Sequence, residues 1–337
     1  MQLKDQYVMQ TVDIAVNIEN VTKEFKQWQR GSDIKDIVTN LLKPKTKTVK
    51  ALNDVSLKIN KGEFVAYAGA NGAGKSTTIK ILSGIMHPSY GKVSVLGLNP
   101  KVSRIELMKR IGVVFGQRTE LWWDHPISAS FDWKRVAWNI DKDQFKKRLD
   151  KLIELLDLSA ILDTFARELS LGQRMRADLA LMLLHNPDVI FLDEPTLGLD
   201  VLAKRHMIDY LKKINQEDGV TIVVTSHDMD DLEEMAQRII LLSNGQIAFD
   251  GSFDSLREHT GNLCRIKIYT NNGHKHNLKT AKLIKSEKGF SEYQFDSQKN
   301  SIPSVLNELS NIDSIHDIEI YKAPIEQVIA ELYTSWK

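Results

Sequence analysis

Apolar and polar residues alternate along the chain in short blocks, and these blocks predict alternating strands and helices. Four apolar runs have the length of buried strands, at residues 64–68, 111–115, 188–192 and 220–225. Apolar residues at helical spacing occupy 76–82, 121–169 and 202–214. One face of the middle helical stretch is formed by Phe145, Leu149, Leu152, Ile153 and Leu156. Strands that alternate with helices predict an α/β fold around a parallel sheet.

Further strands are predicted at residues 12–18, 49–59 and 92–96, and a hairpin at 239–249 turns at Asn244-Gly245. The polar, basic stretch from Trp28 to Lys47 separates the first two of these strands. We interpret it as a solvated inserted loop with a short helix over 34–42. Contact of this loop with lipid headgroups or with a membrane subunit is the alternative.

The pattern changes after Gly251. The remaining segments are predicted as strand 263–270, a polar stretch 271–301 with a strand near 293–295, helix 302–309, strand 315–321 and helix 324–333. We interpret residues 255–337 as a small α+β accessory domain. Residues 1–254 then form the larger domain, because 337 residues exceed a single small core.

Composition excludes several classes of protein. The formal net charge is +1, which gives no reason to expect nucleic acid or an anionic membrane surface as the main partner. Cys264 is the one cysteine, so no intrachain disulfide can form, as suits a reducing compartment. The start of the chain predicts no secretory signal, and no apolar run of about 18 residues is present to span a membrane.

The stretch from Gly69 to Ser76 carries the strongest chemical signal. It reads G-x-x-x-x-G-K-S, follows a predicted strand and opens a predicted helix, as the phosphate loop of nucleotide-binding proteins does. Backbone N–H groups of such a loop bind phosphate oxygens, while Lys75 neutralises phosphate charge and Ser76 reaches Mg²⁺. The expected ATP-binding residues are Gly69, Asn71, Gly72, Ala73, Gly74, Lys75, Ser76 and Thr77. The alternative is a glycine-rich structural turn without a ligand.

Two adjacent carboxylates, Asp193 and Glu194, end the predicted strand 188–192. Ligands of parallel sheets bind at the carboxyl ends of the strands, so both side chains are expected beside the phosphate loop. Asp193 would hold Mg²⁺, and Glu194 would polarise the water that attacks the γ-phosphate. The alternative is a pair of solvated carboxylates.

A third motif, Leu169–Gln173, precedes a helix predicted from Met175 to Leu184. Ser170 and Gln173 have the spacing of a capping box. The motif alone is equally consistent with a simple helix cap and with a second phosphate site at the helix N-terminus.

These three motifs, together with Gln117, residues 197–200 (Leu-Gly-Leu-Asp) and His227, resemble the ATP-binding subunits of ABC transporters in type and order. The resemblance covers about residues 12–250. It implies a P-loop NTPase core with an antiparallel β subdomain and a helical subdomain at about 118–180.

The resemblance also implies roles for individual residues. Gln117 would contact Mg²⁺ and the attacking water, and His227 would contact the γ-phosphate. His227 taken by position alone would instead suggest an ordinary helix start. The residues that would act on the ATP of an opposite subunit are Ser170, Leu171, Gly172, Gln173 and Asp200. The chain departs from the family pattern at Leu171, where the family commonly has glycine.

Aromatic residues leave alternatives open. Phe25 resembles the residue on which related subunits stack adenine, with Trp28 as a rival and a buried core position as the alternative. Trp122 and Trp123 follow Gln117 and are equally consistent with helical-subdomain core and with an exposed groove for a partner.

The function implied is that of an ATPase that binds ATP and Mg²⁺ and drives a membrane transporter by dimer closure. Its expected partners are a second copy of the chain and separate transmembrane permease subunits, with no nucleic acid. Its expected location is the cytoplasmic face of the cell membrane, through the membrane subunit. Residues 255–337 resemble the accessory domain of multidrug exporters such as those for daunorubicin resistance, and 116–124 resembles an uncharacterised export-type branch.

Export is therefore the expected direction, with an importer carrying a regulatory C-terminal domain as the nearer alternative. A soluble ABC-type ATPase acting on ribosomes is a rival, but that class usually carries two such domains. Chromosome-maintenance ATPases are another, but they have long coiled coils between the nucleotide motifs, and no sustained heptads separate Ser76 from Leu169.

Overall fold

The computed structural model describes residues 13–28, 46–116, 118–258, 262–270, 278–310 and 315–335 of the chain. The chain divides into two compact units, Met1–Asp250 and Gly251–Lys337. The domain boundary expected near residue 255 stays a prediction; that residue lies inside helix α9 (Phe253–Glu258).

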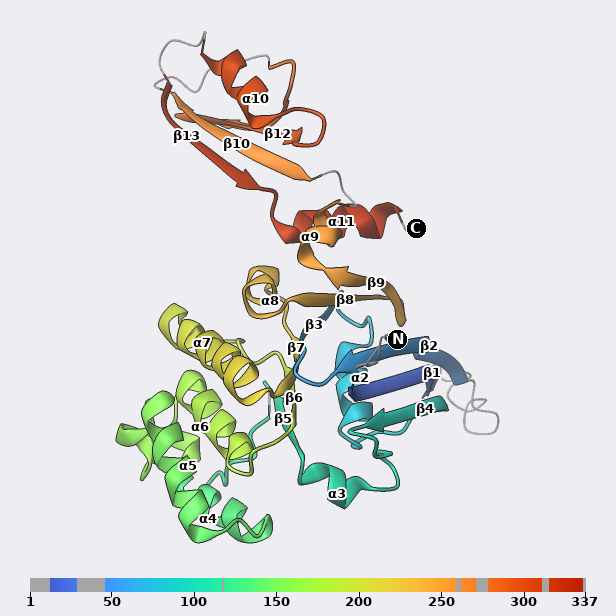
Figure 1. Cartoon of the computed structure of the whole chain (residues 1–337), viewed down its shortest axis with the longest axis vertical. Coiled ribbons are helices and arrows are strands. Elements are labelled where there is room, and N and C mark those ends of the chain that lie inside the picture. The colour runs from blue at the N-terminus through green and yellow to red at the C-terminus, as the bar shows by residue number, and fades with distance from the viewer. Residues whose placement is uncertain are drawn as a thin grey trace, which may run out of the picture. The chain divides into compact units, whose positions relative to one another are not determined.

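A six-stranded sheet organises the first unit, in the order β5-β6-β7-β3-β8-β9 (Figure 1). Its strands are β3 (Phe64–Gly69), β5 (Ile111–Phe115), β6 (Val189–Asp193), β7 (Thr221–Thr225), β8 (Arg238–Ser243) and β9 (Gln246–Ser252). The pairs from β5 through β8 are parallel. Their strands are apolar runs because both faces of a parallel sheet are covered. This arrangement confirms the predicted α/β class.

Helices of this unit pack against the strands of the sheet or against one another. They are α2 (Lys75–Leu82), α3 (Arg104–Met108), α6 (Leu171–Leu183), α7 (Val201–Asp218) and α8 (Met229–Met235). Parallel strands end at the same edge, so the last residues of β3, β6 and β7 lie near one another. Asp193 and Thr225 are paired in register at this edge. The site described below is built there.

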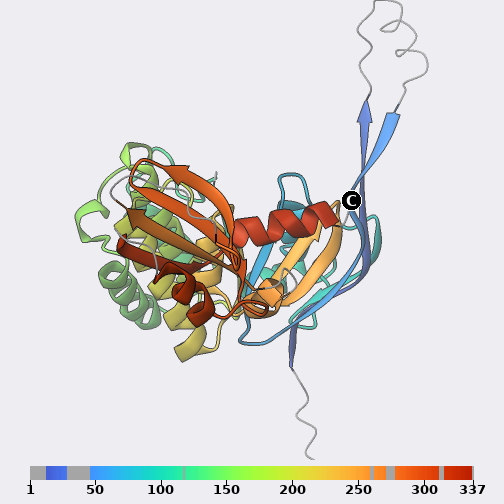
Figure 2. The ribbon, with the colours of Figure 1, turned by 90° about the horizontal axis from the view of Figure 1, so that it is seen from above.

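A three-stranded antiparallel sheet, in the order β2-β1-β4, joins β1 (Ile14–Trp28), β2 (Thr46–Asn60) and β4 (Tyr90–Val95). Figure 2 shows the β1–β2 pair extending as a long two-stranded arm. The prediction of a loop from residue 28 to 47 was wrong at both ends, because β1 reaches Trp28 and β2 begins at Thr46. The helix predicted over 34–42 lies outside the described residues.

A helical segment follows β5 and consists of α4 (Ile127–Ala137), α5 (Lys142–Leu155) and 3₁₀ turns at Ser159–Ile161 and Ala166–Glu168. Asp141 begins α5 by accepting hydrogen bonds from the backbone of the first turn. The predicted apolar face is confirmed, since Phe145, Leu152 and Leu156 are buried. Both α4 and α5 contact α6.

The second unit contains a four-stranded antiparallel sheet in the order β11-β12-β10-β13. Its elements are α9, β10 (Leu263–Thr270), β11 (Lys282–Glu287), β12 (Phe290–Asp296), α10 (Ile302–Leu309), β13 (Ile315–Lys322) and α11 (Ile325–Ser335). The core under α10 includes Ile266, Ile268, Tyr293, Phe295 and Val305. Within the described ranges of the whole chain, no helix is long and apolar enough to cross a bilayer.

Candidate nucleotide site

The phosphate loop runs from β3 into α2 with a backbone that requires glycine. Gly74 precedes the helix with φ +114°, and a Cβ there would lie 2.6 Å from both Ala51 O and Leu52 Cδ2. Gly74 offers no side-chain cap, so α2 begins with backbone N–H groups that no capping side chain accepts. A helix start of this kind binds phosphate oxygens.

Lys75 turns its side chain back into the loop. Its Nζ donates to Gly69 O at 2.6 Å and to Ala70 O at 3.3 Å. Burial lowers the pKa of Lys75, and the carboxylates of Glu194 and Asp193 oppose that shift. The ammonium therefore lies inside the curve of the loop, where phosphate charge would meet it. Among the other predicted loop residues, Asn71 and Gly72 are exposed, Ala73 is buried, and Ser76 and Thr77 are half-buried.

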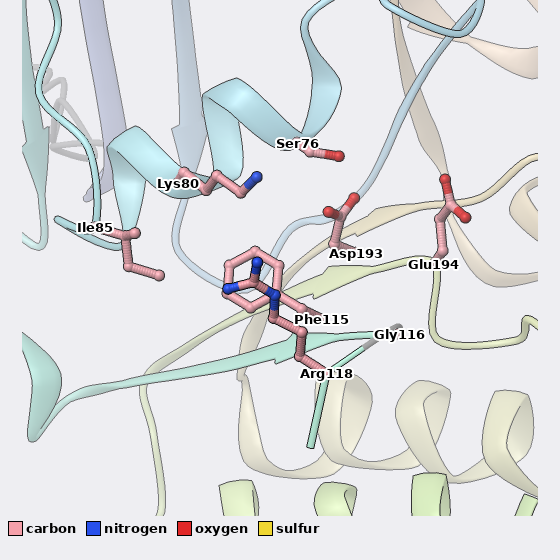
Figure 3. Close-up of a pocket in the computed structure, with 8 residues that line it drawn as sticks. All are labelled: Ser76, Lys80, Ile85, Phe115, Gly116, Arg118, Asp193 and Glu194. Carbon is pink, nitrogen blue, oxygen red and sulfur yellow. The ribbon is translucent and has the colours of Figure 1, made fainter. Parts of the chain in front are cut away.

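A cleft of about 270 Å³ opens beside the loop (Figure 3). The Ser76 hydroxyl and the carboxylates of Asp193 and Glu194 face into it. Thr225 Oγ1 donates to Asp193 Oδ1 at 2.7 Å and so orients that carboxylate. A hydroxyl oxygen and a carboxylate are donors that suit Mg²⁺.

Five cleft residues were not among the predicted site residues: Lys80, Ile85, Phe115, Gly116 and Arg118. Lys80 had a signal, since it lies one helical turn after Ser76 on the same face of α2. Arg118 follows Gln117 directly. Gln117 itself lies outside the described residues, so its role stays a prediction.

Glu194 and His227 meet at the edge of the sheet. His227 Nε2 lies 2.6 Å from Glu194 Oε1, and the two side chains are 48% and 20% exposed respectively. Glu194 has φ +59°, and its N–H donates to Thr225 O at 3.1 Å, which holds this unfavourable backbone in place. A carboxylate bonded to an imidazole beside a phosphate loop can accept a proton from water.

The motif at Leu169–Gln173 forms the capping box that its spacing predicts. Gln173 N donates to Ser170 Oγ at 3.2 Å, and Ser170 N donates to Gln173 Oε1 at 2.9 Å. Asp200 caps α7 in a similar way, accepting from Ala203 N at 2.8 Å. Ser170, Leu171, Gly172, Gln173 and Asp200 are not among the residues that line the cleft of their own chain.

Phe25 lies on β1 with its side chain 36% exposed, so its alternative position in the core was wrong. Lys23 Nζ lies 5.3 Å from the centre of the ring. Leu52, on the paired strand β2, borders Gly74, since a Cβ added to Gly74 would lie 2.6 Å from Leu52 Cδ2. Lys23 on β1 is the register partner of Leu52. The ring is therefore two residues along β1 from the strand position that borders the phosphate loop. The side chain of Trp28 lies outside the described residues.

Trp122 and Trp123 are 39% and 49% exposed. The ring of Trp122 packs edge-on against His125 with centroids 5.5 Å apart, and it lies 5.8 Å from the ring of Trp133. The guanidinium of Arg174 lies 5.8 Å from the ring centre of Trp123. Of the two interpretations left open by the sequence, this exposure supports the surface rather than the core.

A glycine-rich turn opening a helix, with carboxylates at the end of a neighbouring parallel strand, defines a P-loop nucleotide site. The family pattern described as ABC transporter matches residues 52–197. The chain is 31% identical to the ABC transporter ATP-binding protein NatA of Bacillus subtilis, over 64% of this chain and 87% of that protein. It is 32% identical to the energy-coupling factor transporter ATP-binding protein EcfA2 of Clostridium perfringens, over 68% of this chain and 83% of that protein.

A solved structure with a similar fold is the dimeric ATP-binding cassette MJ0796 in a post-hydrolysis state bound to ADP and Pi. It has a TM-score of 0.59 and 28% sequence identity, and the match covers 70% of this chain and 98% of that one. The chain therefore belongs to the ATP-binding subunits of ABC transporters, and it is an ABC-type ATPase.

Proposed function

We propose that this chain hydrolyses MgATP in the cleft between α2 and the end of β6, and that it does so as a dimer that drives a membrane transporter. The observation that carries the proposal is the 2.6 Å contact between Glu194 and His227 beside the phosphate loop. In this pair Glu194 would be the base and His227 would orient it, at the place where the γ-phosphate would lie.

The phosphate loop would hold the triphosphate. Its backbone N–H groups and the start of α2 supply positive potential, and Lys75 supplies a full charge. Lys75 now bonds to the carbonyls of Gly69 and Ala70. We expect phosphate oxygens to replace these acceptors, because an anion interacts more strongly with an ammonium than a carbonyl does.

Mg²⁺ fits the donor set on one side of the cleft. Ser76 and Asp193 would hold it there, with Gln117 as a further ligand. When bound, Mg²⁺ neutralises charge on the β- and γ-phosphates. Thr225 keeps the Asp193 carboxylate oriented toward this position, through the 2.7 Å hydrogen bond.

Glu194 would accept a hydrogen bond from the attacking water. His227 would orient Glu194 and contact the γ-phosphate. Both side chains stay partly exposed, so a water molecule can reach them. The positive φ of Glu194 directs its side chain away from the strand and into the cleft.

A second copy would complete each site with Ser170, Gly172 and Asp200. These residues do not line the cleft of their own chain, and each motif occurs once. Exposed apolar residues surround them, namely Leu171, Leu197, Val201 and Leu202. An apolar surface beside polar contact residues suits a protein interface. A homodimer is the simplest assembly that pairs the two surfaces.

The membrane partner would be a permease at the cytoplasmic face, and we propose export. Support comes from the resemblance of residues 116–124 and 255–337 to export-type subunits. Import is the second candidate, because the chain is 34% identical to the methionine import ATP-binding protein MetN of Geobacillus kaustophilus, over 64% of this chain. Transport into inverted vesicles, compared with right-side-out vesicles, decides the direction.

The Glu194→Gln variant tests the chemistry. It should keep ATP affinity and lose hydrolysis by ~10²-fold or more, because the amide cannot act as a base. ATP should then hold the variant as a dimer. Lys75→Ala should instead lose both affinity and turnover. Glu234→Gln, a matched change at an exposed residue of α8, should change neither. Normal turnover by Glu194→Gln would refute the assignment.

A further inference from the structure

Lys204 joins the first turn of α7 to the segment that follows His227. Its Nζ lies 2.6 Å from Asp228 Oδ2 and 2.6 Å from Asp231 Oδ1. Its backbone N–H donates to Asp200 O at 2.9 Å, so Lys204 follows Asp200 by one helical turn. A single side chain thus connects the helix start at Asp200 with the residue next to His227.

Two of the three charged groups, Lys204 and Asp231, are partly shielded from water, while the Asp228 side chain is 45% exposed. The Lys204 side chain is 25% exposed, and that of Asp231 is 7% exposed. Burial alone would lower the pKa of Lys204, but hydrogen bonds to Asp228 and Asp231 outweigh it and raise that pKa. The ammonium therefore stays charged at neutral pH. Shielded pairs of this kind hold two elements together more firmly than fully exposed pairs do.

Other contacts fix the residues on either side of His227. Asp228 N donates to Ser226 Oγ at 3.0 Å, and Ser226 Oγ lies 3.4 Å from Thr196 Oγ1. Thr196 belongs to the loop between Glu194 and Asp200. The segment carrying His227 is therefore attached to this loop and to the helix after it, at two separate points.

We propose that Lys204 is a positioning residue for ATP hydrolysis, which holds residues 226–231 against the start of α7 so that His227 keeps its contact with Glu194. The inference rests on the proposed function of Glu194 and His227. Because Asp200 and Lys204 share one helix start, displacement of Asp200 at the dimer interface reaches His227 through this ion pair. Lys204 is not among the residues that line the cleft, so it would act through His227 rather than on ATP directly.

The matched control is a second ion pair between the same two helices. Lys212 Nζ on α7 lies 3.6 Å from Glu234 Oε1 on α8, one to two turns further from His227. Lys204→Met and Lys212→Met remove equal charge and keep similar side-chain length. The full chain, with MgATP as the probe, is assayed for kcat, for ATP affinity by equilibrium binding, and for melting temperature.

Lys204→Met should lower kcat by about 10-fold to 100-fold, as a displaced catalytic group does, while ATP affinity is unchanged because the phosphate loop is intact. Lys212→Met should leave kcat and ATP affinity within about 2-fold of the native values. Lys204→Arg keeps the positive charge and should retain kcat to within about 3-fold of the native value. Equal effects of the Met variants on kcat would overturn the proposal, because the pairs would then only fasten two helices.

Two further comparisons make the result decisive. If Lys204→Met is too unstable to assay, Lys204→Gln is compared with Lys212→Gln by the same criterion. If Glu194→Gln hydrolyses ATP normally, the proposed function fails whatever Lys204 does. If Glu194→Gln is inactive while Lys204→Met has native kcat, only the role of Lys204 is refuted.

Discussion

Leu171 lies directly against Gly198: a Cβ added to Gly198 would stand 2.1 Å from Leu171 Cδ2. Leu171 is the first residue of α6, and its position in a helix requires no glycine. The departure from the family pattern therefore leaves the capping box of Ser170 and Gln173 intact. The leucine instead contacts the loop that leads to Asp200, so the two segments proposed to meet a second subunit touch within one chain.

The Gly198→Ala variant tests this contact. Gly198 has φ +73°, so alanine there costs about 1 kcal/mol of backbone strain, and the methyl group also displaces Leu171. We expect a lower melting temperature and weaker ATP-driven dimerisation, measured by size-exclusion chromatography in the Glu194→Gln background. Gly97→Ala is the control, because Gly97 has φ +76° but open space around an added Cβ.

Adding Leu171→Ala to Gly198→Ala removes the displaced side chain but not the backbone strain. Compared with Leu171→Ala alone, the double variant should therefore show only the loss that Gly97→Ala shows relative to the native chain. If Gly198→Ala and Gly97→Ala behave alike, the contact with Leu171 has no consequence for assembly.

Local patterns predicted the parallel strands and the carboxylates after β6, because buried strands are continuous apolar runs with sharp ends. They failed where burial is slight. Strand β11 at the sheet edge is mostly polar and has no fully buried residue, and the five residues of α3 bury only Leu107. The contact of Lys204 with Asp228 had no sequence signal, because residues 24 positions apart are brought together only by the packing of α7 on α8.

Ser170→Arg tests whether the capping-box segment acts on a second subunit. ATP binding by the isolated chain should be preserved, because the phosphate loop is unchanged. ATP-driven dimerisation in the Glu194→Gln background should be lost, because a long cation would occupy the interface. Ser301→Arg is the control, since Ser301 caps α10 in the second unit and its loss costs a similar ~1 kcal/mol. A dimer that persists in Ser170→Arg argues against the assignment.

Asp178 on α6 should make stability depend on pH. Thr119 Oγ1 and Glu120 N both donate to Asp178 Oδ1, at 2.9 and 3.1 Å. Burial outweighs these bonds and raises the pKa of Asp178 to about 6. The folded chain therefore binds this proton more tightly than the unfolded chain, and the contribution of Asp178 to stability falls as pH rises from about 4 to 6.

His185 has the opposite sign, since burial, followed by the charge of Lys134, lowers its pKa to about 4. Its contribution rises with pH from about 4 to 6.5, so the two residues offset each other. Asp178→Asn keeps an acceptor for Thr119 and removes one of these two titrating groups. Relative to the native chain, its unfolding free energy should increase by up to about 3 kcal/mol between pH 4 and 6.

Urea unfolding of both proteins across this pH range measures the difference, and His185→Gln should show a change of opposite sign. A constant difference between Asp178→Asn and the native chain at every pH would mean that Asp178 titrates normally when folded.

Trp122 and Trp123 offer a surface through which ATP hydrolysis could act on the membrane subunit. Both rings are partly exposed and follow the segment of Gln117, and Trp122 N donates to Ser130 Oγ at 2.9 Å, which fixes its backbone. Truncating an aromatic ring that fills a partner's pocket costs ~2 kcal/mol or more of affinity. Trp122→Ala and Trp123→Ala should therefore reduce co-purification of the membrane subunit and reduce transport.

Basal ATP hydrolysis and the melting temperature of the isolated chain should change little in either variant, because the rings are not fully buried. Tyr90→Ala is the control: Tyr90 is 64% exposed on β4, and its loss should leave co-purification unchanged. A core role gives another pattern, in which melting temperature falls clearly because a buried Trp→Ala change costs ~3–5 kcal/mol. If stability and co-purification fall together in both tryptophan variants, the rings support the fold and the docking surface lies elsewhere.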